Sequence, residues 1–240
     1  MELRTRVIQM LMAINEGIVF YPKLRKFYSS KLKDNIPNII DVGSNKGQTI
    51  DFFLKINPKS MIVGFEPNVT LFNKLKRKYT SNPQIKIINM GISSKKGKLL
   101  FYQNVLDETS TFEPLNYESE YLKKKARILG VAPDKIIATT YEVDVITLSD
   151  YLAKSENPVI DVLKIDVEGH ELDCLKGLFD GSKYSIRYLQ LESHNDDMYL
   201  NSHNHDEIHK LLKYNGFNEA ARIKHGFGDF HEIIYEKQDV

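Results

Sequence analysis

Acidic and imidazole side chains crowd one short segment in the second half of the chain. Asp166, Glu168, His170 and Glu171 lie within six residues, at the end of an apolar run. Ligands of open α/β sheets bind beyond the carboxyl ends of the strands, where this segment would lie. Glu171 also suits the first turn of a helix, where its charge is favourable. We therefore predict that Asp166, Glu168 and His170 are catalytic, positioning an acceptor or removing a proton.

A second candidate site is the loop over residues 41–47, DVGSNKG. Glycines at positions 43 and 47 allow a tight turn and the close approach of a ligand. The following helix would point its free N–H groups and positive dipole end into the same space, which suits an anionic or zwitterionic ligand. The strict dinucleotide fingerprint is absent, because Asn45 stands where the middle glycine would be. Asp41, at the end of the preceding strand, is placed to hold the amino group of methionine in S-adenosylmethionine.

Two further positions extend this cofactor site. Glu66 follows the next apolar run, and a carboxylate there accepts hydrogen bonds from ribose hydroxyls of NAD or of S-adenosylmethionine. Asn89 and Gly91 follow the third run, where an adenine would lie. The predicted cofactor site comprises Asp41, Gly43, Ser44, Asn45, Gly47, Thr49, Glu66, Pro67, Asn89, Gly91 and Asp166.

A metal site is an alternative for the same region. The main hypothesis needs no metal, yet Asp166, Glu192 and His194 end two apolar runs and could converge on Mg²⁺. The histidines at 203, 205 and 209 are interpreted as a solvated loop and helix start. The candidates for a general base are Asp166, Glu168, His170, Glu192 and His194.

The elements that must position these residues alternate between strand and helix. Near-continuous apolar runs at 38–42, 61–65 and 85–89 predict buried strands, and amphipathic patterns predict helices between them at 48–55 and 69–79. Such a βαβαβ order predicts a parallel sheet covered on both faces, and right-handed crossovers give the local strand order 3-2-1.

The alternation breaks and then resumes. We interpret residues 97–142, with a strand-like stretch at 98–103 and a charged helix at 118–129, as an inserted lid or substrate region. Strands are predicted at 143–147, 159–166 and 186–192, helices at 170–179 and 205–214, and a hairpin at 217–235. A final antiparallel hairpin predicts the class I methyltransferase arrangement, a Rossmann-like seven-stranded α/β sheet of order 3-2-1-4-5-7-6 with strand 7 antiparallel.

Composition limits the other possibilities. The chain has 240 residues, 42% hydrophobic and 27% charged, with a net charge of +1, so no global basic field recruits nucleic acid. No run reaches the ~20 apolar residues that span a bilayer. The lone Cys174 cannot form an intrachain disulfide, which fits a cytoplasmic protein.

The N-terminal residues 1–36 are interpreted as a helical segment, followed by the main domain at 37–240. Residues 7–20 are fairly apolar and have basic neighbours, but no small-residue cleavage site follows them. We expect this helix to pack on the domain or to cover the site. Weak peripheral contact with a membrane is the alternative.

Three segments together resemble the FkbM family of methyltransferases. They are IIDVGSNKGQT at 39–49, GFEPN at 64–68 and LKIDVEGHELDCLKG at 163–177, with a less specific match in YLQLESH at 188–194. The resemblance covers residues 38–195 and implies an S-adenosylmethionine-dependent transferase, commonly an O-methyltransferase acting on hydroxyls of sugars or secondary metabolites. It also implies that Asp41, Gly43, Glu66 and Asp166 line the cofactor site.

The predicted function is therefore in-line methyl transfer to a hydroxyl of a glycan or small-molecule acceptor. An NAD(P)-dependent Rossmann oxidoreductase and a non-catalytic nucleotide-binding module are the alternatives. The first would carry a cleaner glycine fingerprint, and the second would not need the charges around Asp166. Thr109, Ser110, Thr111 and Tyr117 could contact a polar acceptor. The sequence specifies neither the acceptor nor the oligomeric state.

Overall fold

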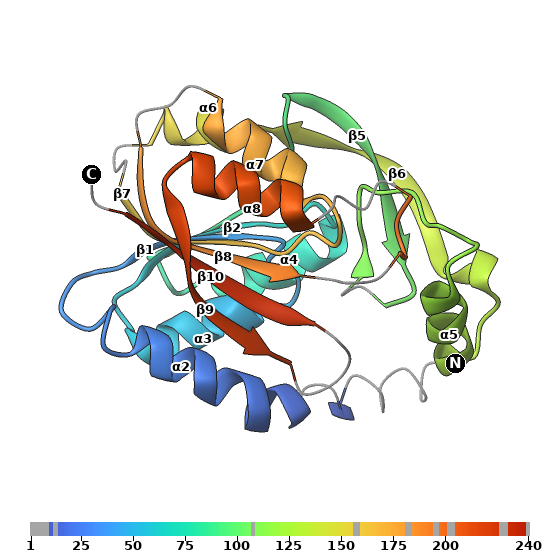
Figure 1. Ribbon diagram of the computed structural model, residues 1–240, viewed down its shortest axis with the longest axis horizontal. Helices are drawn as coiled ribbons and strands as arrows, with labels where there is room; N and C mark the ends of the chain where they lie inside the picture. The colour runs from blue at the N-terminus through green and yellow to red at the C-terminus, as the bar shows by residue number, and fades with distance from the viewer. Residues whose placement is uncertain are drawn as a thin grey trace.

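The computed structural model describes residues 10–11, 14–106, 109–155, 159–180, 184–193, 197–200, 205–225 and 230–238. Two sheets and their covering helices make up this part of the chain (Figure 1). No helix within these residues is long and apolar enough to cross a membrane.

The larger sheet has seven strands. They are β1 (Asn38–Val42), β2 (Met61–Phe65), β3 (Ile85–Ile88), β7 (Val159–Ile165), β8 (Ser185–Ser193), β9 (Phe217–Lys224) and β10 (His231–Lys237). Their spatial order is β3-β2-β1-β7-β8-β10-β9, which in chain order is the predicted 3-2-1-4-5-7-6. β10 is antiparallel to β8 and to β9, whereas the other pairs are parallel. The predicted fold class is confirmed.

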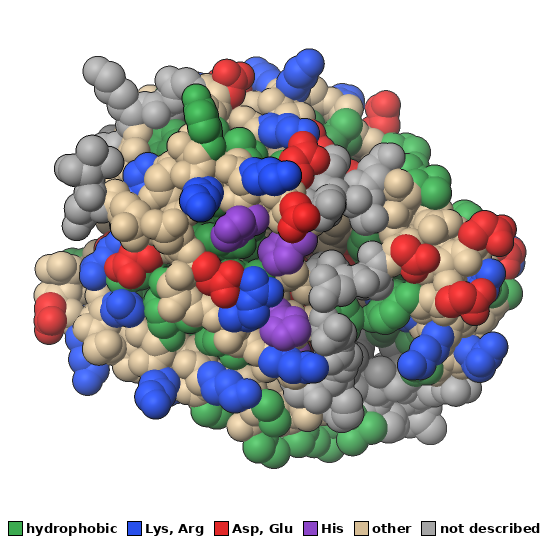
Figure 2. Space-filling view, viewed as in Figure 1, with side chains coloured by type: hydrophobic (Ala, Val, Ile, Leu, Met, Phe, Trp, Pro, Cys, Tyr) green, Lys and Arg blue, Asp and Glu red, His purple; other side chains and the backbone are tan. Residues whose placement is uncertain are grey.

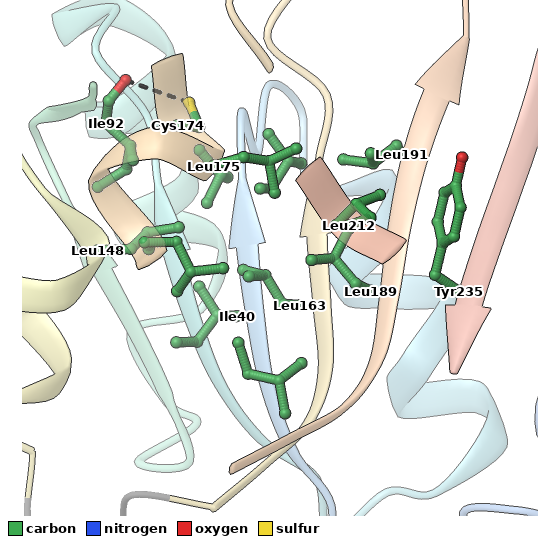
Figure 3. Packing of buried hydrophobic residues seen from close by; sticks show 14 of the residues in the cluster. Ile40, Ile92, Leu148, Leu163, Cys174, Leu175, Leu189, Leu191, Leu212 and Tyr235 are labelled. Atoms are coloured by element: carbon green, nitrogen blue, oxygen red, sulfur yellow. Dashed lines mark hydrogen bonds between the residues drawn. The ribbon is translucent and has the colours of Figure 1, made fainter. Parts of the chain in front are cut away.

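Helices cover both faces of this sheet because successive apolar residues of each strand point to opposite sides. Ile40, Leu163 and Leu189 pack against the helices α6 (Leu148–Leu152), α7 (Glu171–Phe179) and α8 (His205–Tyr214), as Figure 3 shows. Their neighbours Ile39 and Val162 belong to the core of the other face. That face is covered by α2 (Tyr21–Tyr28), α3 (Gln48–Ile56) and α4 (Val69–Lys78).

A smaller sheet, which the sequence did not predict, stands beside the first. It has the order β4-β6-β5, from β4 (Gly91–Ile92), β5 (Gly97–Asn104) and β6 (Ile137–Ile146). The helix α5 (Glu120–Leu129) and the short 3₁₀ turn η3 (Pro133–Lys135) lie between β5 and β6 in the chain. The strand predicted at 143–147 is thus only the end of β6. Its first half was missed because three consecutive residues at 138–140 are exposed and give no buried pattern.

The N-terminal part of the described chain packs on the main domain. A short π-helical turn, η1 (Glu16–Phe20), leads directly into α2. Phe20, Leu24 and Tyr28 are buried in the core on the α3 face of the sheet. The segment is therefore part of the folded unit and reaches the site described next.

Candidate functional site

A cavity of about 1030 Å³ opens at the carboxyl ends of β1, β2, β7 and β8. Its walls also include residues of η1, α2 and α5, and the β9–β10 hairpin. Figure 2 shows Lys and Arg side chains along the lower left edge of one face, and acidic and basic side chains interspersed over the upper part of that face.

The glycine loop forms one wall of the cavity and leans on the segment after β7. Gly43 has a φ of +84°, and its N–H and that of Ser44 both donate to the carbonyl of Phe65 at 3.0 Å. A Cβ at position 43 would lie 1.9 Å from the carbonyl oxygen of Asp166. Only glycine therefore allows the loop to approach the Asp166 segment this closely.

Glu66 joins the glycine loop to the end of β2. One carboxylate oxygen accepts from the N–H of Asn45 at 2.7 Å, and the other accepts from the N–H of Asn68 at 2.8 Å. Asn45 has a φ of +47°, which is uncommon for a residue with a side chain. The carboxylate is buried yet lines the cavity. A carboxylate oxygen accepts more than one hydrogen bond, so a ligand hydroxyl is a chemically suitable donor to Glu66.

Two buried polar atoms beside Glu66 test whether a cofactor fits here. Asn45 Oδ1 and Asn68 Nδ2 have no hydrogen-bond partner among the described residues, and both residues line the cavity. Leaving such groups unpaired costs free energy, which a polar ligand would recover. Apolar side chains of Phe65, Leu71 and Met90 also line the wall and suit a flat ring. The donor set thus fits a ligand with both hydroxyl and aromatic parts, such as an adenosine.

The structure brings together most, but not all, of the predicted cofactor residues. The cavity is lined by Gly43, Ser44, Asn45, Thr49, Glu66, Pro67, Gly91 and Asp166. Asp41, Gly47 and Asn89 do not line it. Asn89 instead donates from Nδ2 to the carbonyls of Glu66 and Pro67, at 2.8 and 3.0 Å, and so fixes the end of β2.

Asp41 lies beneath the loop and not in the cavity wall. It is fully buried, and neither carboxylate oxygen has a hydrogen-bond partner among the described residues. Burial raises the pKa of Asp41, and the ammonium group of Lys164 opposes this rise. The sequence suggested that Asp41 contacts the amino group of a cofactor directly. This geometry does not favour such a contact.

Three carboxylates converge on the cavity at the ends of β7 and β8. Asp166, Glu168 and Glu192 each place one oxygen within 4.8 Å of the others, and we refer to them as the carboxylate cluster. Tyr199 donates its hydroxyl to Glu168 Oε2 at 2.7 Å. Glu168 has a φ of +56°, a strained conformation that is typical of functional sites. His194, the third ligand of the alternative metal site, lies outside the described residues.

Lys164 supports this cluster from beneath. Its Nζ lies 2.8 Å from Asp166 Oδ2, which confirms the pairing of Lys164 with a neighbouring carboxylate. Burial lowers the pKa of Lys164, but the carboxylates of Asp166, Asp41 and Glu232 outweigh burial, so the pKa is raised. The lysine therefore stays charged and holds one oxygen of Asp166 in place.

Glu232 is a cavity residue that the sequence reasoning missed. It lies directly opposite Glu192 in the antiparallel β8–β10 pair, and it is 3% exposed. Burial raises the pKa of Glu232 to about 8; Lys164 opposes this rise, while Glu192 and Asp166 add to it. A glutamate beside the apolar pair Ile233 and Ile234 in a predicted hairpin strand was the signal that could have revealed it.

His170 does not line the cavity, which corrects its prediction as a catalytic base. Its Nδ1 lies 2.6 Å from Glu113 Oε1, and its Nε2 lies 2.9 Å from Ser93 Oγ. All three side chains are buried. With both ring nitrogens engaged away from the cavity, His170 ties α7 to β4 and to the segment between β5 and α5.

The segment between β5 and β6 supplies the outer wall of the cavity. Thr109, Ser110 and Thr111 line it as the sequence suggested, but Tyr117 does not. The helix α5 adds wall residues that the sequence did not reveal: Tyr121, Lys124, Lys125, Ile128 and Leu129. Their place in the wall depends on how the smaller sheet packs beside the larger one. No local sequence pattern predicts that packing.

Comparison with known proteins identifies relatives of this chain. Methyltransferase sdnD of Sordaria araneosa is 29% identical over 218 residues, 85% of this chain and 82% of that protein. 2-O-methyltransferase NoeI of Sinorhizobium fredii is 24% identical, over 65% of this chain and 63% of its own length. Hexuronic acid methyltransferase AglP of Haloferax volcanii is 28% identical, over 64% and 54%.

The fold also matches solved structures. A Clostridium thermocellum protein described as an rRNA methylase superposes with a TM-score of 0.52 at 8% identity, over 92% of this chain and 97% of that one. Such a low identity supports the fold alone. The family model of the FkbM methyltransferase domain matches residues 41–219, which include the glycine loop, Glu66 and the carboxylate cluster. The chain belongs to the FkbM family of methyltransferases.

Proposed function

We propose that this methyltransferase transfers the methyl group of S-adenosylmethionine to a hydroxyl of a sugar, glycan or secondary metabolite. The observation that carries the proposal is the single cavity in which the glycine loop and Glu66 face the carboxylate cluster. NoeI is named a 2-O-methyltransferase and AglP a hexuronic acid methyltransferase, and both names fit hydroxyl-rich acceptors.

The cofactor half of the site is formed by the chain segments around Glu66. In the proposal, Glu66 accepts hydrogen bonds from the ribose hydroxyls, and Asn45 and Asn68 turn their unpaired polar atoms toward the ligand. Phe65, Leu71 and Met90 enclose the adenine. When bound, S-adenosylmethionine supplies a methyl group on a sulfonium, which a nucleophile attacks in line.

The acceptor half of the site is the carboxylate cluster. Lys164 donates to Oδ2 of Asp166 and holds its carboxylate in place. Asp166 is therefore suited to orienting the acceptor hydroxyl. Tyr199 holds Glu168 through one oxygen, and in the proposal this carboxylate removes the hydroxyl proton. Fixed carboxylates hold the acceptor oxygen close to the methyl group and remove its proton as the C–O bond forms.

The test is methyl transfer by Glu168→Gln, compared with Glu142→Gln, an exposed residue of β6. Production of S-adenosylhomocysteine would be measured with a panel of neutral and acidic sugars, and cofactor binding by calorimetry. We expect Glu168→Gln to lose about 100-fold or more in turnover while binding cofactor as the wild type does. Full turnover by Glu168→Gln would refute the assignment of this residue, and transfer only to amines would refute O-methylation.

A further inference from the structure

The carboxylate cluster has the spacing of a ligand set for a divalent cation. One oxygen from each of Asp166, Glu168 and Glu192 lies within 4.8 Å of the other two. Oxygens on opposite sides of a Mg²⁺ ion are about 4.2 Å apart, and around Ca²⁺ about 4.8 Å, because the metal–oxygen distances are about 2.1 and 2.4 Å. One ion could therefore contact all three carboxylates without a large rearrangement.

Two of these ligands are already held in place by neighbours. Asp166 Oδ2 lies 2.8 Å from Lys164 Nζ, and Glu168 Oε2 accepts from the Tyr199 hydroxyl at 2.7 Å. Each of these contacts engages one oxygen of its carboxylate. Supporting contacts of this kind orient the carboxylates that bind metals in proteins.

An independent observation comes from Glu232. This side chain is 3% exposed and lines the same cavity, and its Oε2 has no hydrogen-bond partner among the described residues. It projects from the same face of the sheet as Glu192, because the two residues are directly opposite in the β8–β10 pair. A buried carboxyl group beside three carboxylates is stabilised either by keeping its proton or by a nearby cation.

Two basic groups lie close to carboxylates of the cavity. Lys164 contacts Asp166, and His225 Nε2 lies 3.8 Å from Glu192 Oε1. Lys46, Lys124 and Lys125 also line the cavity, together with the carboxyl groups of Asp166, Glu168, Glu192 and Glu232. A divalent ion among the three clustered carboxylates would relieve their mutual repulsion.

We propose that the carboxylate cluster binds a divalent, oxygen-preferring cation such as Mg²⁺ or Mn²⁺, with Glu232 as the buried carboxylate beside it. The ion lies where the acceptor oxygen must sit, so the site would favour acceptors with adjacent oxygens, such as sugar diols or hydroxy acids. This inference about the acceptor class rests on the proposed function.

Cation binding can be measured without any methyl transfer. The full chain, freed of metal with a chelator, would be titrated with MnCl₂ and MgCl₂ by calorimetry, and with MnCl₂ by electron paramagnetic resonance. We expect one site of millimolar or tighter affinity. Glu192→Gln and Glu168→Gln should each weaken Mn²⁺ binding about tenfold or more, and the exposed Glu142→Gln should not change it. Circular dichroism would show that each variant is folded.

Each outcome separates this proposal from the proposed function. Absence of Mn²⁺ binding to the wild type, or equal binding by Glu192→Gln, Glu168→Gln and wild type, overturns the cation site. Full methyl transfer to a hydroxyl in the presence of EDTA also overturns it, while leaving O-methylation intact. Cation binding that is lost in both variants supports the site even if no hydroxyl acceptor is ever methylated.

Discussion

At the scale of single residues, the site depends on charges that are buried together and on backbone positions that only glycine can occupy. Lys164 lies among Asp41, Asp166 and Glu232, and it offsets only part of their repulsion. Gly43 allows the glycine loop to lie against the Asp166 segment.

Glu232→Gln should stabilise the protein increasingly as pH rises. The pKa of Glu232 is about 8 in the folded protein and 4.5 in the unfolded reference. Its favourable contribution to the stability of the fold is therefore complete below pH 4.5 and is lost as the pH rises through 8. Glutamine does not titrate. Between pH 4.5 and 8, the free energy of unfolding of Glu232→Gln therefore rises relative to that of the wild type, by up to about 1.4 kcal/mol per pH unit. Urea unfolding at pH 5, 7 and 9 with EDTA present measures this gain. A difference that does not vary with pH would contradict the assigned pKa.

Gly43→Ala should both destabilise the fold and abolish cofactor binding. The new Cβ would lie 1.9 Å from the carbonyl of Asp166, and a φ of +84° alone costs a non-glycine residue about 1–2 kcal/mol. Gly97→Ala is the matched control, because nothing lies within 4 Å of its Cβ. Thermal unfolding and calorimetry with S-adenosylhomocysteine would compare the two. Unchanged binding in Gly43→Ala would mean that the loop is not at the cofactor.

Cys174 should be inert in the folded protein. Its side chain is fully buried, and burial raises the pKa of the thiol well above its ordinary value, so almost no thiolate forms. A disulfide reagent at pH 8 should modify it only in denaturant. Rapid modification of the native chain would show that α7 opens readily.

At the scale of elements, the strand and helix boundaries of the larger sheet were largely readable from the sequence. The runs at 38–42 and 61–65 are apolar and bounded by turn residues, and they match β1 and β2 at both ends. The smaller sheet was not predicted, because β5 and β6 pair across an intervening helix and alternate poorly between buried and exposed residues. The orientation of His170 was equally unreadable, since it depends on Glu113, which lies 57 residues away in the chain.

His170→Ala should weaken the attachment of α7 to the β4–β5 region and leave the chemistry in place. Its partners Glu113 and Ser93 would be left unpaired and buried, which costs about 1–3 kcal/mol for each group. We therefore expect a lower Tm, retained cofactor binding and retained turnover below the new Tm. A stable His170→Ala protein with no turnover would restore His170 as a catalytic residue.

At the scale of the whole molecule, one cavity collects contributions from distant parts of the chain. The cofactor wall comes from the first half of the larger sheet, the carboxylate cluster from its centre, and the outer wall from η1, α5 and the smaller sheet. Glu66, Asp166, Glu168 and Glu192 could be found from the sequence because they end apolar strands. The α5 wall could not be assigned in this way, since its position depends on long-range packing.

The central claim is that the wall formed by the glycine loop and Glu66 binds S-adenosylmethionine and not a dinucleotide. Calorimetric titration of the full chain with S-adenosylmethionine, S-adenosylhomocysteine and NAD tests it most directly. We expect S-adenosylmethionine and S-adenosylhomocysteine each to bind at one site and NAD not to bind. We expect Gly43→Ala to lose binding of the first two ligands. Binding of NAD without binding of S-adenosylmethionine would contradict it.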